Sequence, residues 1–159
     1  MHLTYQTDYA MRVLIYLAVN RGRPMRVADV AESYGISRNH LLKVALRLGR
    51  LGYLTAVRGR SGGIALAREP ADINLGEVVR GMEDDFGLVE CMQKEGGACA
   101  ISPSCRLKHA VRKALDAFLS VFDSYSLADI TENREALTEL LGLPRIGHGA
   151  EMVDSQRSR

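Results

Sequence analysis

The sequence has no long apolar run, and this absence argues against a membrane-spanning helix. Its longest apolar stretch, residues 13–19, is far shorter than the ~18 residues that cross a bilayer. The first ten residues, MHLTYQTDYA, are polar and carry an aspartate where a secretory signal peptide has a basic start and an apolar centre. We therefore expect a cytoplasmic protein with no membrane partner, whose thiols stay reduced.

The sequence also lacks the short motifs of common enzymes. It contains neither the GK[ST] of a P-loop nor a G-x-G-x-x-G dinucleotide fingerprint, and it has no recognisable nucleophile motif. It shows no internal repeat and no second group of cysteines. These absences predict that the chain is not an enzyme.

Charge is divided unevenly along the 159 residues. Residues 1–68 contain eleven Lys and Arg against three Asp and Glu, a net charge of +8, whereas residues 69–159 carry a net charge of −6. A basic half joined to an acidic half favours a polyanion as the partner of the first half only. A chance asymmetry is the alternative.

Three helices are predicted in the basic half. The first spans residues 8–20 after Thr7 as its N-cap, and the second spans residues 27–34 and ends at Gly35. The third spans residues 38 to about 48. Its inward-facing side chains are predicted to be Leu41, Leu42, Ala45, Leu46 and Leu48.

The second and third helices, joined by a glycine turn, form the pattern of a helix-turn-helix. The second member of such a pair enters the major groove of DNA. The third helix begins with polar side chains that can bond to base edges and phosphates, although an ordinary solvated helix start is the alternative. The predicted DNA contacts of this helix are Ser37, Arg38, Asn39, His40 and Lys43.

Residues 53–66 predict a β-wing. Two short strands, 53–57 and 64–66, flank the glycine-rich tip RGRSGG. Arginines on such a tip suit a narrow, electronegative minor groove, so Arg58 and Arg60 are predicted to contact DNA there. A phosphate-cradling nucleotide loop is the rival interpretation, but its motif is absent. Helix-turn-helix and wing together predict a DNA-binding domain over residues 1–68.

Residues 69–143 are predicted to form a second, helical domain. Asn74 and Glu77 have the spacing of a capping box, which opens a short helix. A long amphipathic helix begins near Ser104 and has little of its own chain to cover it. Pairing with the same helix of a second subunit is the simplest cover and predicts a homodimer; packing on the first helix is the alternative. The apolar stripe comprises Leu107, Ala110, Val111, Ala114, Leu115, Phe118, Leu119 and Phe122. A last short helix is expected before a disordered tail over residues 144–159.

All three cysteines, Cys91, Cys99 and Cys105, lie in one segment, CMQKEGGACAISPSC. An odd number of cysteines in a reducing compartment favours metal or redox chemistry over a structural disulfide. Thiolates select zinc, Cu(I) or iron–sulfur clusters. Four interpretations are open: buried structural cysteines, a zinc site completed by His109, a thiol redox switch, or an iron–sulfur cluster.

The composition and spacing of the segment bear on each of the four. Its Gly, Gln, Lys and Glu residues make a poor core. Zinc sites usually contain C-x(2–4)-C pairs, whereas the spacing here is C-x7-C-x5-C-x3-H. A redox switch needs only two cysteines of low thiol pKa. Cysteine spacings in iron–sulfur proteins vary widely, which favours the cluster without excluding the others.

Four segments of the chain together resemble the NsrR/IscR family of bacterial winged-helix regulators, which carry an iron–sulfur cluster. These segments are LTYQTDYAMRVLIYLA, GISRNHLLKV, VRGRSGGIAL and C-x5-CRLKHA, in that order. The resemblance covers about residues 1–143 and is strongest to nitric-oxide-sensing members, in SRNH, CRLK and YSLADI. It implies a mainly α fold with a small β-wing, built as a winged helix-turn-helix plus a long dimerisation helix. It further implies a homodimeric repressor of promoter DNA.

The resemblance also implies a ligand set. Cys91, Cys99 and Cys105 would ligate a [4Fe-4S] or [2Fe-2S] cluster, and Asp8 would reach across from the other subunit as the fourth ligand. A carboxylate at a helix start has an ordinary structural explanation too. His109 lies one residue from the histidine position of IscR-like members and ranks below Asp8.

The signal is left open by the spacing of the first two cysteines. Nitric oxide, acting through loss or nitrosylation of the cluster, is the expected signal of an NsrR-like repressor. The seven-residue gap between Cys91 and Cys99 instead resembles RirA-like regulators, which respond to iron. A zinc-stabilised DNA-binding module and a small iron–sulfur oxidoreductase are the alternatives from other classes.

Overall fold

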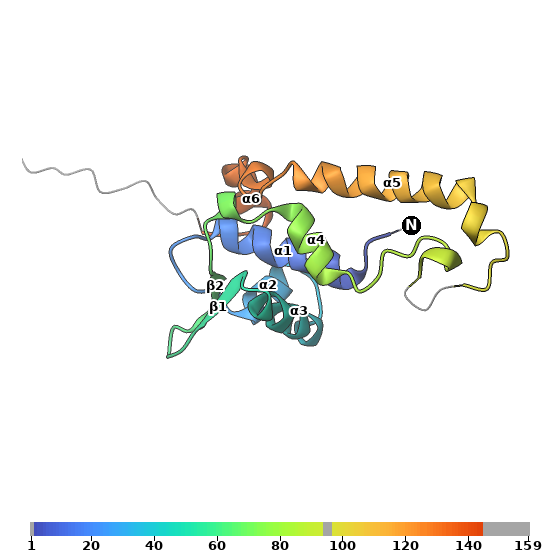
Figure 1. Cartoon of the computed structure of the whole chain (residues 1–159). Helices are drawn as coiled ribbons and strands as arrows, with labels where there is room; N and C mark the ends of the chain where they lie inside the picture. Colours follow the sequence, from blue (N-terminus) through green and yellow to red (C-terminus); the bar gives the residue numbers. More distant parts are fainter. Residues whose placement is uncertain (1, 94–96, 145–159) are drawn as a thin grey trace, which may run out of the picture.

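The computed structural model describes residues 2–93 and 97–144. The chain is mainly helical and carries a small two-stranded antiparallel sheet, which confirms the predicted fold class (Figure 1). Its helices and strands are α1 (Tyr5–Val19), α2 (Val27–Tyr34), α3 (Arg38–Arg50), β1 (Leu54–Val57), β2 (Gly63–Leu66), α4 (Leu75–Met82), α5 (Arg106–Asp123) and α6 (Arg134–Leu140). Apart from Pro144, the tail predicted over residues 144–159 lies outside the described residues.

Helix α1 begins at Tyr5 rather than at the predicted Asp8. Its N-cap is Thr4, whose hydroxyl accepts a hydrogen bond from the amide of Thr7 at 3.4 Å. Thr7, the predicted cap, is instead fully buried, and its hydroxyl donates to the carboxylate of Glu83. A buried hydroxyl requires a partner, and here the partner comes from a distant part of the chain.

The helix-turn-helix forms as predicted, but the inward face of α3 differs. Gly35 ends α2 with φ +63°, in the left-handed region that favours glycine. Leu42 and Leu46 were predicted to face inward, yet they are 38% and 64% exposed. The buried stripe follows the spacing i, i+3, i+4, i+7, which places Leu42 and Leu46 on the outer side of the helix. The buried residues of α3 are Leu41, Val44, Ala45 and Leu48.

The wing is fastened to the helix-turn-helix through backbone hydrogen bonds. Strand β1 pairs antiparallel with β2 from Leu54–Leu66 to Val57–Gly63. Just before α2, Met25 and Ile64 exchange amide-to-carbonyl bonds of 2.9 and 2.8 Å. A Cβ at Gly63 would lie 2.4 Å from the Met25 carbonyl oxygen, so only glycine fits at this contact.

Helix α1 lies at the centre of the molecule, against α3 and α4, and α5 packs on α4 (Figure 1). Its residues Leu14 and Tyr16 are buried together with Leu41 of α3 and Leu127 beyond α5. This main core therefore includes side chains on both sides of residue 68. The division into domains 1–68 and 69–143 stays a prediction.

The long helix α5 buries only part of its predicted stripe. Leu115 and Leu119 are buried with Val79 of α4 in a second, smaller apolar cluster. By contrast, Leu107 is 67% exposed, and Ala110 and Ala114 are exposed as well. The first turns of α5 extend past α1, and within the described residues their apolar side chains stay exposed (Figure 1).

The chain ends, as far as it is described, on the expected last short helix. Arg134 at the start of α6 donates from Nε to the carbonyl of Val19 at 2.9 Å, which ties α6 to the end of α1. Within the described ranges, none of the helices is both long and apolar enough to span a lipid bilayer.

Candidate DNA-binding and metal-binding sites

The predicted DNA contacts of α3 all lie on its exposed N-terminal part. Buried Leu41 and Val44 hold α3 against the rest of the domain, so the opposite side of its first turns faces solvent. None of the five predicted side chains forms a hydrogen bond or an ion pair with another described residue. These five are Ser37, Arg38, Asn39, His40 and Lys43.

The wing tip presents its two arginines in the same unpaired state. Gly59 has φ +117° and its carbonyl accepts from the amide of Gly62 at 3.0 Å, which closes the turn. A Cβ at Gly62 would lie 2.4 Å from the Val57 carbonyl oxygen, so the tight turn needs glycine there too. Arg58 and Arg60 on this tip are exposed and have no partner among the residues described.

Other arginines of the basic half are occupied within the protein. Their partners, in sequence order, are Asp8 for Arg12, Glu69 for Arg21, Asp29 for Arg26, Asp84 for Arg47 and the ring of Tyr53 for Arg68. The exposed cations of this half without such a partner in the described chain are Arg23, Arg38, Lys43, Arg50, Arg58 and Arg60. Sequence reasoning named four of these and missed Arg23 and Arg50. Unpaired cations are the ones that can neutralise DNA phosphates at no cost in internal ion pairs.

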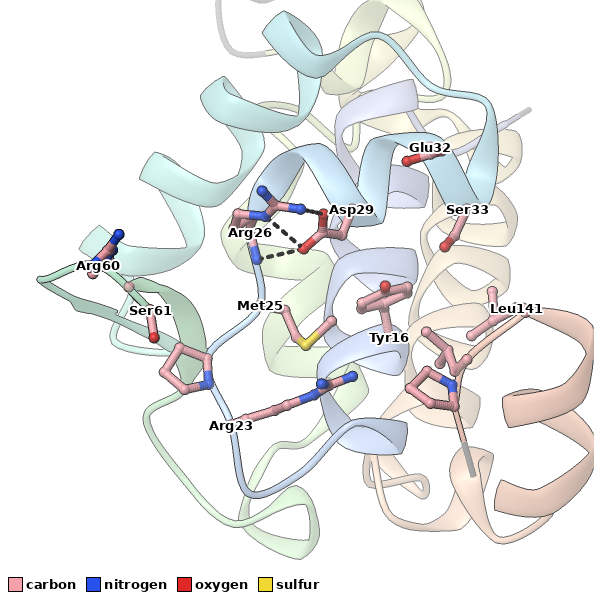
Figure 2. A pocket seen from close by; sticks show the side chains of 15 residues that line it. Tyr16, Arg23, Met25, Arg26, Asp29, Glu32, Ser33, Arg60, Ser61 and Leu141 are labelled. Carbon is pink, nitrogen blue, oxygen red and sulfur yellow. Dashed lines mark hydrogen bonds and ion pairs between the residues drawn. The ribbon is translucent and has the colours of Figure 1, made fainter. Parts of the chain in front are cut away.

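A groove of about 860 Å³ runs between the wing, α2 and residues 141–144 (Figure 2). Arg60 lies on its wing side. On the α2 side, the guanidinium of Arg26 donates to Asp29, which lowers the pKa of that carboxyl. Charges of both signs line the groove: Arg23, Arg26 and Arg60 stand against Asp29 and Glu32.

The three cysteines lie on the segment that connects α4 with α5. Cys91 is in a short 3-10 turn, Glu90–Met92, and Cys105 is the residue immediately before α5. All three are free thiols; Cys99 is exposed and the other two are half-buried. The segment lies at the N-terminal end of α5, away from the wing (Figure 1).

The structure does not gather these cysteines into a ligand set. Across residues 2–93 and 97–144, no group of three or more His, Cys, Asp or Glu side chains is placed to hold a metal ion. The chemistry of the donors nevertheless fits a soft metal centre, because Cys91, Cys99 and Cys105 are unpaired thiols and none is buried. The predicted ligand set therefore stays a prediction.

Asp8, the predicted fourth ligand, has a structural partner on its own helix. Its carboxylate accepts a hydrogen bond from Nε of Arg12 at 3.1 Å, and the ion pair brings Nη2 of Arg12 within 2.8 Å of the other carboxylate oxygen. Both side chains are about two-fifths exposed, and the Arg12 guanidinium also lies 5.8 Å from the ring centres of Tyr9 and Tyr34. His109 is exposed on the first turns of α5.

Sequence reasoning missed a set of contacts at residues 81–84, here called the junction, which links α4 to the cysteine segment. Glu83 accepts hydrogen bonds from Thr4 and Thr7 at the start of α1. Arg47 of α3 donates to the carbonyl of Gly81 and to the carboxylate of Asp84. These partners are far apart in the sequence, and no local pattern pairs them.

A helix-turn-helix with a wing and a set of unpaired cations on both defines a winged-helix DNA-binding protein. Residues 3–133 match the family model Rrf2, described as an iron-dependent transcriptional regulator. The chain belongs to the Rrf2 family.

Named relatives agree with this assignment. The chain is 52% identical over 142 residues to the HTH-type transcriptional regulator NsrR of Bacillus subtilis (strain 168), which covers 89% of this chain and 97% of that protein. It is 46% identical to the HTH-type transcriptional regulator NsrR of Geobacillus kaustophilus (strain HTA426), with coverage of 89% and 97%. These matches confirm the resemblance seen in the sequence, and they identify the chain as a DNA-binding transcription regulator rather than an enzyme.

Solved structures show the same fold. T. potens IscR matches with a TM-score of 0.68 at 25% identity, over 94% of each chain. CymR (YrzC), the global cysteine regulator of B. subtilis, matches with a TM-score of 0.64 over 84% of this chain and 98% of that one. At 24% identity, the second match supports the fold alone.

Proposed function

We propose that the protein is a homodimeric repressor that releases promoter DNA when nitric oxide attacks an iron–sulfur cluster on its cysteine segment. The observation that carries the proposal is the position of three free thiols on the segment between the DNA-reading half and α5. The NsrR-named relatives, at 42–52% identity, support it. The site of action is the cytoplasm, where the promoter DNA of bacteria lies.

The DNA contacts of the proposal use the unpaired cations. Arg38 and Lys43, with Ser37, Asn39 and His40, would contact bases and phosphates of the major groove. Arg58 and Arg60 on the wing would enter the minor groove, where negative potential is strongest when the groove is narrow. Binding through several phosphates makes affinity steeply dependent on salt. In a dimer, affinity also depends on the distance between the two α3 helices, which must match the spacing of the half-sites.

Cys91, Cys99 and Cys105 would hold a [4Fe-4S] or [2Fe-2S] cluster, with Asp8 of the partner subunit as the fourth ligand. When bound, such a cluster supplies iron that nitric oxide can ligate. Asp8 would have to exchange its ion pair with Arg12 for the metal, so we expect the Asp8 side of the cluster to be the most weakly held. Loss of this link would free the cysteine segment of one subunit from α1 of the other.

The homodimer of the proposal is supported by an apolar seam on α5. The seam is separate from the buried face that carries Leu115 and Leu119. Its residues alternate at spacings of three and four, which is the repeat of a helix pair, and its three alanines permit close approach. The seam consists of Leu107, Ala110, Ala114, Ala117 and Val121, all exposed.

Two substitutions to lysine test the seam. Ala114→Lys places a charge in it, and we expect a monomer in analytical ultracentrifugation. Asp116→Lys on another face of the same helix is the matched control and leaves the dimer intact. A dimer that persists in Ala114→Lys contradicts pairing through α5.

Iron is the second candidate for the signal, and the protein would then be an iron-responsive regulator. It is favoured by the seven-residue gap between Cys91 and Cys99 and by the description of the matching family model as iron-dependent. In this alternative the same residues bind DNA and cluster, and scarcity of iron rather than nitric oxide causes release.

One experiment separates the two signals. Anaerobically purified protein is first assayed for iron, sulfide and zinc. It is then titrated on promoter DNA with nitric oxide, with oxygen and with an iron chelator in parallel. We expect iron and sulfide together, and release of DNA by nitric oxide. Release by the chelator alone assigns the iron signal, and a colourless protein with stoichiometric zinc contradicts the cluster.

A matched pair of variants tests Asp8 as a ligand. Asp8→Asn and Arg12→Gln both break the ion pair on α1, but only the first removes the carboxylate. If Asp8 is a ligand, the cluster is lost faster in Asp8→Asn than in Arg12→Gln. Equal rates of loss, followed by the visible absorbance, assign Asp8 to the ion pair alone.

A further inference from the structure

We infer that Arg47 is a positioning residue that couples the cysteine segment to the DNA-reading helix α3, and that it does not contact DNA. The inference rests on the proposed function, since it names the route by which a change at the cysteines reaches α3. It is carried by the contacts of one guanidinium with three residues in two other parts of the chain.

The Arg47 side chain joins α3 to the junction and to α1. Its Nε donates to the Gly81 carbonyl at 3.1 Å, and its Nη2 donates to the Asp84 carboxylate at 2.8 Å. Its Nη1 lies 3.4 Å from Oε1 of Gln6, near the start of α1. Because these bonds engage every nitrogen of the guanidinium, Arg47 differs from the unpaired cations of the DNA-reading surface.

The position of Arg47 on α3 also separates it from the predicted DNA contacts. It lies in the last turn of the helix, whereas Arg38 and Lys43 lie in the first turns, which enter the groove. Its side chain is only 28% exposed. Arg47 therefore faces the protein rather than DNA.

The junction has little freedom to move without α3. A Cβ at Gly81 would lie 3.0 Å from Cδ1 of Leu51, so the end of α4 packs directly on the residue that follows α3. On its other side, Glu83 accepts from the amide and the hydroxyl of Thr4 at 2.8 and 3.1 Å and from Thr7. Tightly packed elements of this kind transmit a displacement rather than absorb it.

The junction leads directly to the cysteines. Phe86 and Met92, on either side of the short stretch that reaches Cys91, pack against the apolar cluster that includes Leu115 of α5. A rearrangement at Cys91 therefore disturbs a segment that is anchored at one end by these contacts and at the other by the Asp84–Arg47 bond. The route runs from Cys91 through Asp84 and Arg47 to α3.

The test measures coupling and salt dependence in the full-length dimer. Operator affinity of wild type and Arg47→Gln is measured by fluorescence anisotropy, with and without the cluster, over a range of salt. Allosteric coupling is typically about 5–150-fold, so we expect the affinity ratio between the two forms to fall about fivefold or more in Arg47→Gln. The slope of log affinity against log salt stays unchanged, because no phosphate contact is lost.

Two variants control for position and for folding. Arg50→Gln, in the same last turn of α3, removes an exposed cation with no partner in the described chain; whatever its effect on affinity itself, the affinity ratio between the two forms stays at the wild-type value. Asp84→Asn weakens the same bond from the 79% exposed side and lowers the ratio without altering α3, which keeps the test valid if Arg47→Gln folds poorly. In the double variant, Arg47→Gln with Asp84→Asn, the affinity ratio falls no further than in either single variant.

Each outcome decides a different statement. If Arg47→Gln and Asp84→Asn keep the wild-type ratio, the inference is wrong while the proposed function stands. If Arg47→Gln lowers the salt slope by about one, Arg47 is a phosphate contact and the inference is wrong. If the wild-type protein binds operator equally with and without the cluster, the proposed function fails and the coupling role fails with it.

Discussion

The guanidinium of Arg80 on α4 and the carboxylate of Asp123 at the end of α5 form a two-bond ion pair, with N–O distances of 2.5 and 2.8 Å. These hydrogen bonds lower the pKa of Asp123 from its usual value. Asn74, at the start of α4, also donates to the Asp123 carbonyl at 2.7 Å. The two helices are thus joined at both charged and neutral groups.

Removal of Arg80 is expected to return the Asp123 pKa to the ordinary range. In Arg80→Gln, carboxyl-carbon NMR then shows Asp123 titrating at higher pH than in the wild type, because the hydrogen bonds from Arg80 are lost. Asp129, whose pKa is lowered by hydrogen bonds from Ser126, serves as the internal control and does not move. An Asp123 titration that is the same in both proteins contradicts the ion pair.

The same ion pair gives stability a defined pH dependence. A carboxyl whose folded pKa is depressed stabilises the fold above its unfolded pKa, and this contribution is lost as pH falls through the folded pKa. We therefore expect the stability difference between wild type and Arg80→Gln, from urea unfolding, to be present at pH 6 and to disappear below the folded pKa of Asp123. A difference that persists at that acidity has another cause.

Two N-cap positions are expected to separate stability from DNA binding. Asn74 accepts from the Glu77 amide at 3.1 Å, so Asn74→Ala costs about 1 kcal/mol or more of unfolding free energy. Ser37 occupies the N-cap of α3 but makes no side-chain capping bond. Ser37→Ala therefore changes stability little, measured by urea unfolding, while it weakens operator binding. A large stability loss in Ser37→Ala would be inconsistent with the structure.

Two leucines test the burial pattern. Leu14 on α1 is fully buried, so Leu14→Ala is expected to cost about 2–5 kcal/mol. Leu46 on α3 is 64% exposed, and Leu46→Ala is expected to stay within about 0.5 kcal/mol of wild type. If urea unfolding shows comparable losses of unfolding free energy in both variants, the original prediction that Leu46 faces the core is restored.

The wing arginines are expected to set part of the salt dependence. Each phosphate contact adds about 0.9 to the slope of log affinity against log salt. Arg58→Ala and Arg60→Ala therefore each lower the slope by about that amount wherever they contact phosphate, and the affinity falls. Arg21→Gln, which loses only its ion pair with Glu69, is the matched control. An unchanged affinity in both wing variants contradicts a role of the wing in binding.

The parts of the fold that the sequence predicted correctly depend on local signals. Gly35 specifies the left-handed end of α2, and Asn74 with Glu77 specifies the start of α4. The errors arose where tertiary contacts decide. Thr7 is a good N-cap residue, but the distant Glu83 engages it, and α1 begins a turn earlier.

The candidate site also has features that local sequence signals predict and features that only long-range contacts decide. The exposed polar residues on α3 and the wing follow from helix periodicity and glycine turns, so Arg38 and Arg58 could be named in advance. Whether a cation is free or paired depends on long-range partners, which is why Arg50 and Arg47 could not be sorted from sequence. The proposed ligand set draws Asp8 from a second subunit, so it would not be complete in one chain.

The backbone bridge between Met25 and Ile64 ties the wing to the start of the helix-turn-helix by two hydrogen bonds. Because only glycine fits at position 63, the wing cannot be re-aimed by substitution at this contact. In the proposed homodimer, the length of DNA covered by one protomer would then stay constant when the cysteine segment changes. A regulatory signal would act on the phase between the two footprints along the duplex, and we expect operators with altered centre-to-centre spacing to select one functional state over the other.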